Sequence, residues 1–116
     1  MLNGKVPFAV ARVDTNVPGL SVVPATIDLM AFERESMAAT GRHYRLRDAI
    51  ALMLATEDPA TATTYILIDC PPSLNLLTVN ALAAADAVLV PLQCEFFALE
   101  GLAQLLSTVE EIRVRL

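Results

Sequence analysis

Apolar residues follow two different patterns along this chain. In residues 46–54, and again in 98–116, they recur at steps of three and four, which predicts amphipathic helices with one inward stripe. Residues 20–23, 65–69 and 87–91 are instead short apolar runs without regular alternation. Runs of this kind are typical of strands that are covered on both faces in a parallel sheet. The pattern therefore predicts an α/β fold with three strands.

Turn and cap residues divide the rest of the sequence. Pro7 is tolerated in a first helical turn and predicts a short helix through about residue 14. Val17-Pro-Gly predicts a turn, and Thr26 or Asp28 is a suitable cap for the helix expected next, through about residue 40. Ser73 is a good cap for a helix that runs through about residue 85.

The strand, helix and strand expected between residues 65 and 91 make a βαβ unit. Strands in such a unit are parallel, and the connection is right-handed in nearly all cases. No linker, repeat or low-complexity tract interrupts the chain. We therefore expect residues 1–116 to form a single α/β domain.

Asp69 is the candidate site residue with the clearest position. It ends the apolar run 65–69 and is followed by Cys70, Pro71 and Pro72. Ligands of open α/β sheets bind outside the carboxyl ends of the strands, and a carboxylate there is the kind of oxygen ligand that Mg²⁺ takes. An acid that only ties down a turn is the alternative, and the acid and prolines alone leave both readings open.

The residues that follow Asp69 are more specific. Ser73-Leu-Asn-Leu-Leu-Thr-Val-Asn80 and its continuation through Gly101-Leu closely resemble the ParA family of partition ATPases, within the deviant P-loop superfamily that includes MinD. MinD-like proteins usually place Pro-Ala-Gly after the acid, and Mrp-like proteins Pro-Pro-Gly, so Ser73-Leu-Asn favours the partition branch. Residues 17–29 also resemble the segment between the second and third motifs of that family.

The resemblance has departures. Glu33 and Glu35 match the family, but Arg34 and Ser36 stand where it prefers apolar residues. The phosphate-binding Lys-Gly-Gly-X-Gly-Lys-Thr loop and the Asp-X-Asp-Pro-Gln segment do not occur in these 116 residues, and family members continue well past the last predicted helix. We therefore expect an internal fragment that lacks the Walker A segment and the C-terminal part of a ParA-like protein.

The resemblance implies a partial P-loop NTPase-like parallel sheet with flanking helices. It implies ATP and Mg²⁺ as family cofactors, with Asp69 holding the metal through water and the turn of Cys70, Pro71 and Pro72 sensing the nucleotide. Phosphoryl transfer depends on positioning and charge stabilisation, which a lone acid does not supply. We expect no catalytic residue, no cofactor and no ATP hydrolysis in this chain alone, and a metal at Asp69 only if the missing segments are supplied.

The resemblance leaves three functions open. The first is the family's own, ATP-dependent chromosome or plasmid partitioning by a ParA-like dimer, with a ParB-type protein and non-specific DNA as partners. The second is a non-enzymatic fragment that pairs with a full-length ParA-like protein, and the third is the product of a decayed gene. In the family, the strand before the glycine-rich loop lies next to the strand that ends in the acid matching Asp69. Its loss would expose backbone groups and apolar faces inside the sheet, so we expect poor solubility or a partner.

Composition narrows the class of protein. The 55% hydrophobic content is above the usual range, and a net charge of −5 gives no overall electrostatic footprint for nucleic acid.

Cys70 and Cys94 lack metal-ligand spacing and are expected to be reduced, and His43 is expected to be an exposed residue at a helix end. With neither a signal peptide nor an apolar run of membrane-spanning length, we expect a cytoplasmic protein without a membrane partner. The modest arginine cluster is interpreted as a solvated helix face: Arg34, Arg42, Arg45 and Arg47.

Overall fold

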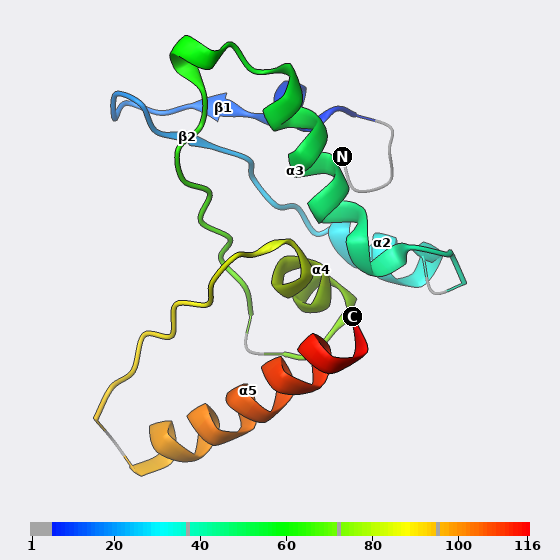
Figure 1. Ribbon diagram of the computed structural model, residues 1–116, viewed down its shortest axis with the longest axis vertical. Helices are drawn as coiled ribbons and strands as arrows, with labels where there is room; N and C mark the ends of the chain where they lie inside the picture. The colour runs from blue at the N-terminus through cyan, green and yellow to red at the C-terminus, as the bar shows by residue number, and fades with distance from the viewer. Residues whose placement is uncertain (1–5, 37, 72, 95) are drawn as a thin grey trace. The chain divides into compact units, whose positions relative to one another are not determined.

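The computed structural model describes residues 6–36, 38–71, 73–94 and 96–116. They fall into two compact units, Met1–Ala84 and Ala85–Leu116, each of which is described by itself. The elements in chain order are α1 (Phe8–Ala11), β1 (Val13–Asp14), β2 (Ser21–Val22), α2 (Leu29–Ser36), the 3₁₀ turn η1 (Arg42–Tyr44), α3 (Arg45–Thr56), the 3₁₀ turn η2 (Pro59–Thr61), α4 (Leu76–Ala84) and, in the second unit, α5 (Phe96–Arg115) (Figure 1).

β1 and β2 form an antiparallel hairpin, in which Val13 pairs with Val22. The turn between them is the predicted Val17-Pro-Gly, since the Leu20 N–H donates to the Val17 carbonyl over 3.1 Å and Gly19 has a φ of 77°. Proline followed by a glycine with positive φ is the sequence of a type II turn. The prediction of this turn is confirmed.

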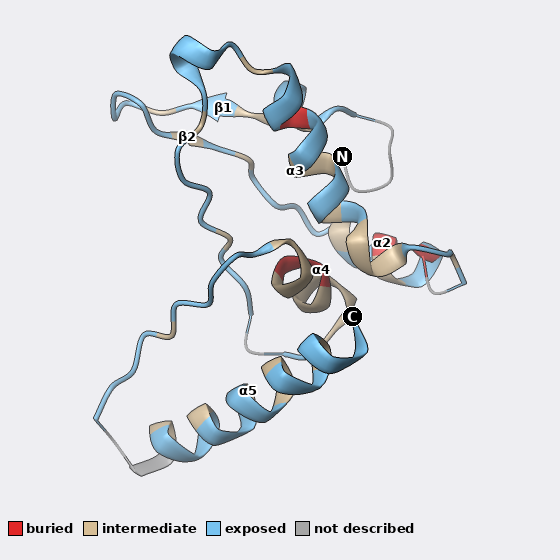
Figure 2. Ribbon diagram, viewed as in Figure 1, coloured by how far each residue is buried: buried red, intermediate tan, exposed pale blue. Residues whose placement is uncertain are grey.

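The predicted sheet of three parallel strands is wrong for the described residues. Residues 21–22 do form a strand, but they pair antiparallel with β1, and residues 65–69 and 87–91 belong to no strand. The predicted burial fails as well, because Leu67 is 90% exposed and Leu89 is 87% exposed. Figure 2 shows both segments largely in the colour of exposed residues.

The reason lies in how strands are stabilised. A hairpin closes across a tight turn at a small entropic cost, whereas parallel strands must be joined by a long crossover. A strand also needs a hydrogen-bonded neighbour, and no described segment supplies one to residues 65–69. Apolar composition alone therefore does not make this segment a strand.

The core of the first unit is helical. Its buried apolar side chains are Phe32 of α2, Met53 of α3 and Ala81 of α4. The inward stripe predicted for α3 is confirmed at Met53, whereas Leu54 at its end is 44% exposed. The short helix expected after Pro7 stops at Ala11, since the next residue takes an extended conformation and begins the hairpin.

Two more helices lie close to where the sequence places them. α4 begins two residues later than expected, because Asn75, not Ser73, caps it: the Thr78 N–H donates to Asn75 Oδ1 over 2.9 Å. In the second unit α5 covers nearly all of the predicted helix 98–116. Its C-terminal end carries an i,i+3 ion pair of Arg113 with Glu110 and an i,i+4 ion pair of Arg115 with Glu111.

Candidate functional site

A partly open groove lies within the first unit. It is lined by the hairpin, the inward side chains of α3, residues 61–71 and the middle of α4. Its volume of about 1410 Å³ exceeds the roughly 300–1,000 Å³ of an enclosed ligand pocket. The groove therefore offers room for a ligand or a further chain segment without enclosing it.

Asp69 borders this groove together with Cys70 and Pro71. All three residues are exposed, and the fourth predicted site residue, Pro72, lies outside the described residues. In the described part of the chain, no group of three or more His, Cys, Asp and Glu residues is placed to hold a metal ion. Asp69 thus offers one carboxylate at the groove, and further ligands for a cation would have to come from elsewhere.

The described glycines do not form a phosphate cradle. Gly19 lies in the hairpin turn and Gly41 directly precedes η1, both with positive φ. A Cβ added at either position, or at Gly101, would meet nothing within 4 Å, so the turn conformation and not a close neighbour favours glycine at Gly19 and Gly41. Glycines this widely separated do not supply the run of adjacent backbone N–H groups with which a phosphate loop holds its ligand.

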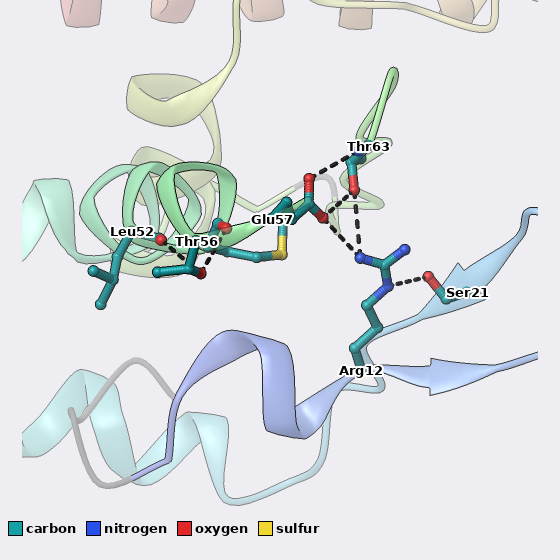
Figure 3. Close-up of polar contacts among 7 residues, drawn as sticks. Arg12, Ser21, Leu52, Thr56, Glu57 and Thr63 are labelled. Atoms are coloured by element: carbon teal, nitrogen blue, oxygen red, sulfur yellow. Dashed lines mark hydrogen bonds and ion pairs between the residues drawn. The ribbon is translucent and has the colours of Figure 1, made fainter. Parts of the chain in front are cut away.

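A polar network fixes the beginning of the segment that carries Asp69. The carboxylate of Glu57 accepts the backbone N–H of Thr63 over 2.8 Å and the Thr63 hydroxyl over 2.6 Å. Arg12 Nη1 donates to the same carboxylate over 2.9 Å, and Arg12 Nε donates to Ser21 on β2. Figure 3 shows Arg12 between Ser21 on one side and Glu57 and Thr63 on the other.

The network has an electrostatic consequence at Glu57. Its side chain is only 13% exposed, yet the pKa of the carboxyl is lowered from its ordinary value. The hydrogen bonds from Thr63 are the largest cause, and Arg12 adds a smaller effect against the opposing effect of burial. The ionised form of Glu57 is therefore the one that the fold favours.

A second carboxylate contacts the far end of the same segment. Glu33 of α2 accepts the backbone N–H of Leu76, the first residue of α4, over 2.9 Å. An anion at this position interacts favourably with the N-terminus of a helix. The contact joins α2 to the chain that leads from Asp69 into α4.

Asn80 is fully buried in α4 and ties this helix to η1 and α3. Its amide group donates to the carbonyls of Arg42 (2.8 Å) and Leu76 (2.9 Å). Its oxygen accepts the backbone N–H of Leu46 over 3.2 Å. Three of its hydrogen bonds are therefore made inside the core, and the side chain fixes how α4 meets the start of α3.

The other predicted candidates have ordinary surroundings. Cys70 and Cys94 are free, as expected, and partial burial together with the charge of Asp69 raises the pKa of the Cys70 thiol. His43 is half-buried in η1 and accepts a hydrogen bond from Arg42 Nε, so its prediction as an exposed residue is wrong. The solvated face is confirmed for Arg34, Arg45 and Arg47, all exposed, whereas Arg42 is half-buried. None of the helices in the described ranges combines the length and apolar character of a membrane span.

Sequence reasoning missed the roles of four residues. Arg12 and Glu57 are 45 positions apart, and no local pattern links them. Asn80 lies at an inward position of a helix that is otherwise apolar, which is a signal for a buried, hydrogen-bonded side chain. Glu33 was singled out only as a match to a family pattern, and its contact depends on how α2 packs.

Comparisons with known proteins identify the family of this chain. A family model described as an AAA domain matches residues 2–116. The chain is 56% identical over 113 residues to the chromosome partitioning protein ParA of Caulobacter vibrioides (strain NA1000 / CB15N), an alignment that covers 97% of this chain and 41% of the relative. It is 48% identical over 102 residues to the sporulation initiation inhibitor protein Soj of Bacillus subtilis (strain 168), covering 88% of this chain and 38% of Soj.

A third relative extends the agreement. The chain is 54% identical over 99 residues to the chromosome partitioning protein ParA of Myxococcus xanthus (strain DK1622), covering 85% of this chain and 33% of the relative. The chain thus spans about two-fifths or less of the length of these relatives. On the family model and these identities, the chain belongs to the AAA domain family and, within it, to the ParA family of partition proteins.

Proposed function

We propose that this chain is the Asp69-bearing part of a ParA-like protein that segregates chromosomes or plasmids. The observation that carries the proposal is the 56% identity to a chromosome partitioning protein over 97% of the chain. One family model runs through both compact units, which supports a single domain over residues 1–116. Such a protein would act in the cytoplasm with ATP, Mg²⁺, a second ParA-like chain, a ParB-type protein and non-specific DNA.

Within this function we assign Asp69 to the metal side of a nucleotide site. Its carboxylate borders the groove, and Mg²⁺ prefers oxygen ligands and retains several waters, so a water-mediated contact fits one exposed acid. Cys70, Pro71 and Pro72, which follow Asp69 in the sequence, are assigned to sensing the nucleotide. The phosphate side is not assigned to residues of this chain, and we expect no ATP hydrolysis by the 116 residues alone.

A second candidate function is supported by a different observation. Tyr65 and Leu67 are 86% and 90% exposed, and Leu89 in the second unit is 87% exposed. Exposed apolar residues of this size mark surfaces that another chain covers. A non-enzymatic role, in which the chain pairs with a full-length ParA-like protein through these segments, is therefore the alternative.

A segregation assay tests the first proposal. The gene that encodes this chain is deleted in its source organism, and the fraction of cells that have lost the chromosome or plasmid is counted. We expect the loss to rise at least several-fold, to be restored by the wild-type gene and not by Asp69→Ala. Asp86→Ala is the matched control, since it removes an exposed acid that is not among the residues lining the groove and should restore segregation.

Two outcomes would contradict the proposal in different ways. Segregation that is unchanged in the deletion overturns the partitioning role. Full restoration by Asp69→Ala overturns the assignment of Asp69 alone. Co-purification of the chain with a full-length ParA-like protein, lost when Tyr65 and Leu67 are both replaced by serine, would instead favour the pairing role.

A further inference from the structure

The segment that carries Asp69 is fastened at both ends by carboxylates, one from the C-cap residue of α3 and one from α2. At its beginning, Glu57 accepts the backbone N–H of Thr63 over 2.8 Å. At its end, Glu33 accepts the backbone N–H of Leu76 over 2.9 Å. Asp69 lies near the middle of the stretch between these two amides.

Both contacts are hydrogen bonds to an ionised acceptor. Such bonds are shorter and about twice as strong as those between neutral groups. The first is itself supported, because Arg12 holds Glu57 and is held in turn by Ser21 of the hairpin (Figure 3). The second starts from α2, where Glu33 is half-buried beside the core residue Phe32.

Between Thr63 and Ser73 the chain has little else to fix it, whereas Ser73 is itself held by α4, since the Thr78 hydroxyl donates to the Ser73 carbonyl over 2.6 Å. Residues 62–71 form no helix or strand, and Tyr65 and Leu67 are almost fully exposed. Neither backbone pairing nor side-chain burial therefore determines where Asp69 lies. Its place at the edge of the groove depends on how the two ends are held.

We infer that Glu57 and Glu33 are positioning residues that hold Asp69 at the groove. The geometry of the two carboxylate contacts supports this hold on both ends of the segment, which we call the bracket. The chemical role of Asp69 at the groove rests on the proposed function. Neither glutamate touches a substrate in this account. Each acts through the backbone of the segment that it holds.

Backbone order parameters from nitrogen-15 relaxation of the purified 116-residue chain test the bracket. For amides 65–70 we expect wild-type values between the rigid level of about 0.85 and the flexible level of about 0.6, and values below about 0.6 when Glu57→Ala and Glu33→Ala are combined. The single alanine variants should lie between. Glu57→Gln and Glu33→Gln should restore part of the order, because the amide oxygen still accepts the backbone N–H.

Two control variants separate this role from general destabilisation. Asp58→Ala removes a carboxylate contact of 2.9 Å to the Ala60 N–H, the same kind of bond one residue from Glu57, which does not reach the Asp69 segment. Glu35→Ala removes an exposed acid from the same helix as Glu33. Both should leave residues 65–70 as ordered as in wild type, and the α3 amides check folding in every variant.

The outcomes decide between the bracket and the proposed function. Unchanged order at residues 65–70 in both single alanine variants overturns the bracket; if the double variant unfolds, the single variants decide. Loosened order combined with full segregation in cells that carry Glu57→Ala or Glu33→Ala overturns the positioning of Asp69 for function. Normal segregation in the deletion strain overturns the proposed function, and the order parameters still decide the bracket.

Discussion

The first unit contains two neighbouring regions with opposite character. The helices α3 and α4 bury Met53 and Ala81 and enclose Asn80 with its hydrogen bonds made. Residues 65–69, which are just as apolar, leave Leu67 90% exposed. Helices satisfy their backbone groups internally, whereas a strand depends on a neighbour. The comparison teaches that apolar composition becomes a core only where the backbone is already satisfied.

Asn80→Ala in the helical region is one of the two substitutions with the largest expected effect. The substitution leaves the Leu46 N–H and two carbonyls without their buried partner, and we expect the free energy of unfolding to fall by about 2–4 kcal/mol. Denaturant titration followed by helical circular dichroism measures it. Asn16→Ala in the exposed hairpin loop is the control and should change stability by less than about 0.5 kcal/mol. Equal effects of the two variants would contradict the role of Asn80.

Replacing one large apolar side chain by alanine in each region compares the two regions directly. Met53→Ala opens the core and should lower the free energy of unfolding by about 2–5 kcal/mol. Leu67→Ala removes a side chain that is already in solvent and should cost less than about 0.5 kcal/mol. Both are measured in the same denaturant titration. A large loss in Leu67→Ala would show that residues 65–69 are buried after all.

The pH dependence of stability tests Glu57, which lies between α3 and the segment that carries Asp69. Because the pKa of Glu57 is lowered in the folded chain, its contribution is complete above the ordinary glutamate pKa of 4.5 and is lost as the pH falls through the folded value. The stability difference between wild type and Glu57→Gln should therefore be constant from neutral pH to about pH 5 and shrink below it. A difference that grows on acidification would contradict the sign of the shift.

The smallest expected effect concerns the thiol beside Asp69. The charge of Asp69 contributes to the raised pKa of Cys70, so Asp69→Asn should lower that pKa and speed alkylation of Cys70. We expect a change of a few-fold at mildly alkaline pH, measured with iodoacetamide in a Cys94→Ala background. The same rate in both proteins would mean that Asp69 does not lie near the thiol.

The sequence predicted those parts of the fold that depend on local interactions. The turn at Val17-Pro-Gly and the helices α3 and α5 follow from residue type and spacing alone. The cap of α4 was misplaced because Ser73 and Asn75 are both good cap residues, and only the observed contact to Thr78 selects between them. The strand at residues 65–69 was wrong because strand formation depends on a neighbour that is not among the described residues.

The candidate site, too, was predicted only in part from the sequence. Asp69 was found from its place after an apolar run, and it does border the groove. The acids that hold its segment could not be found, because the contact of Glu33 with Leu76 spans 43 positions and no local pattern predicts the contact of Glu57 with Thr63. Residue type indicates which group can do chemistry, and tertiary packing determines what holds it in place.

Amide hydrogen exchange across the first unit tests the central claim most directly. The account predicts that the N–H groups of residues 66–69 exchange within about tenfold of the rate of an unstructured chain, since they lack strand partners, while amides in the interior of α3 are protected far more strongly. Protection of residues 66–69 equal to that of α3 would contradict the account, because it would place the Asp69 segment inside a hydrogen-bonded sheet.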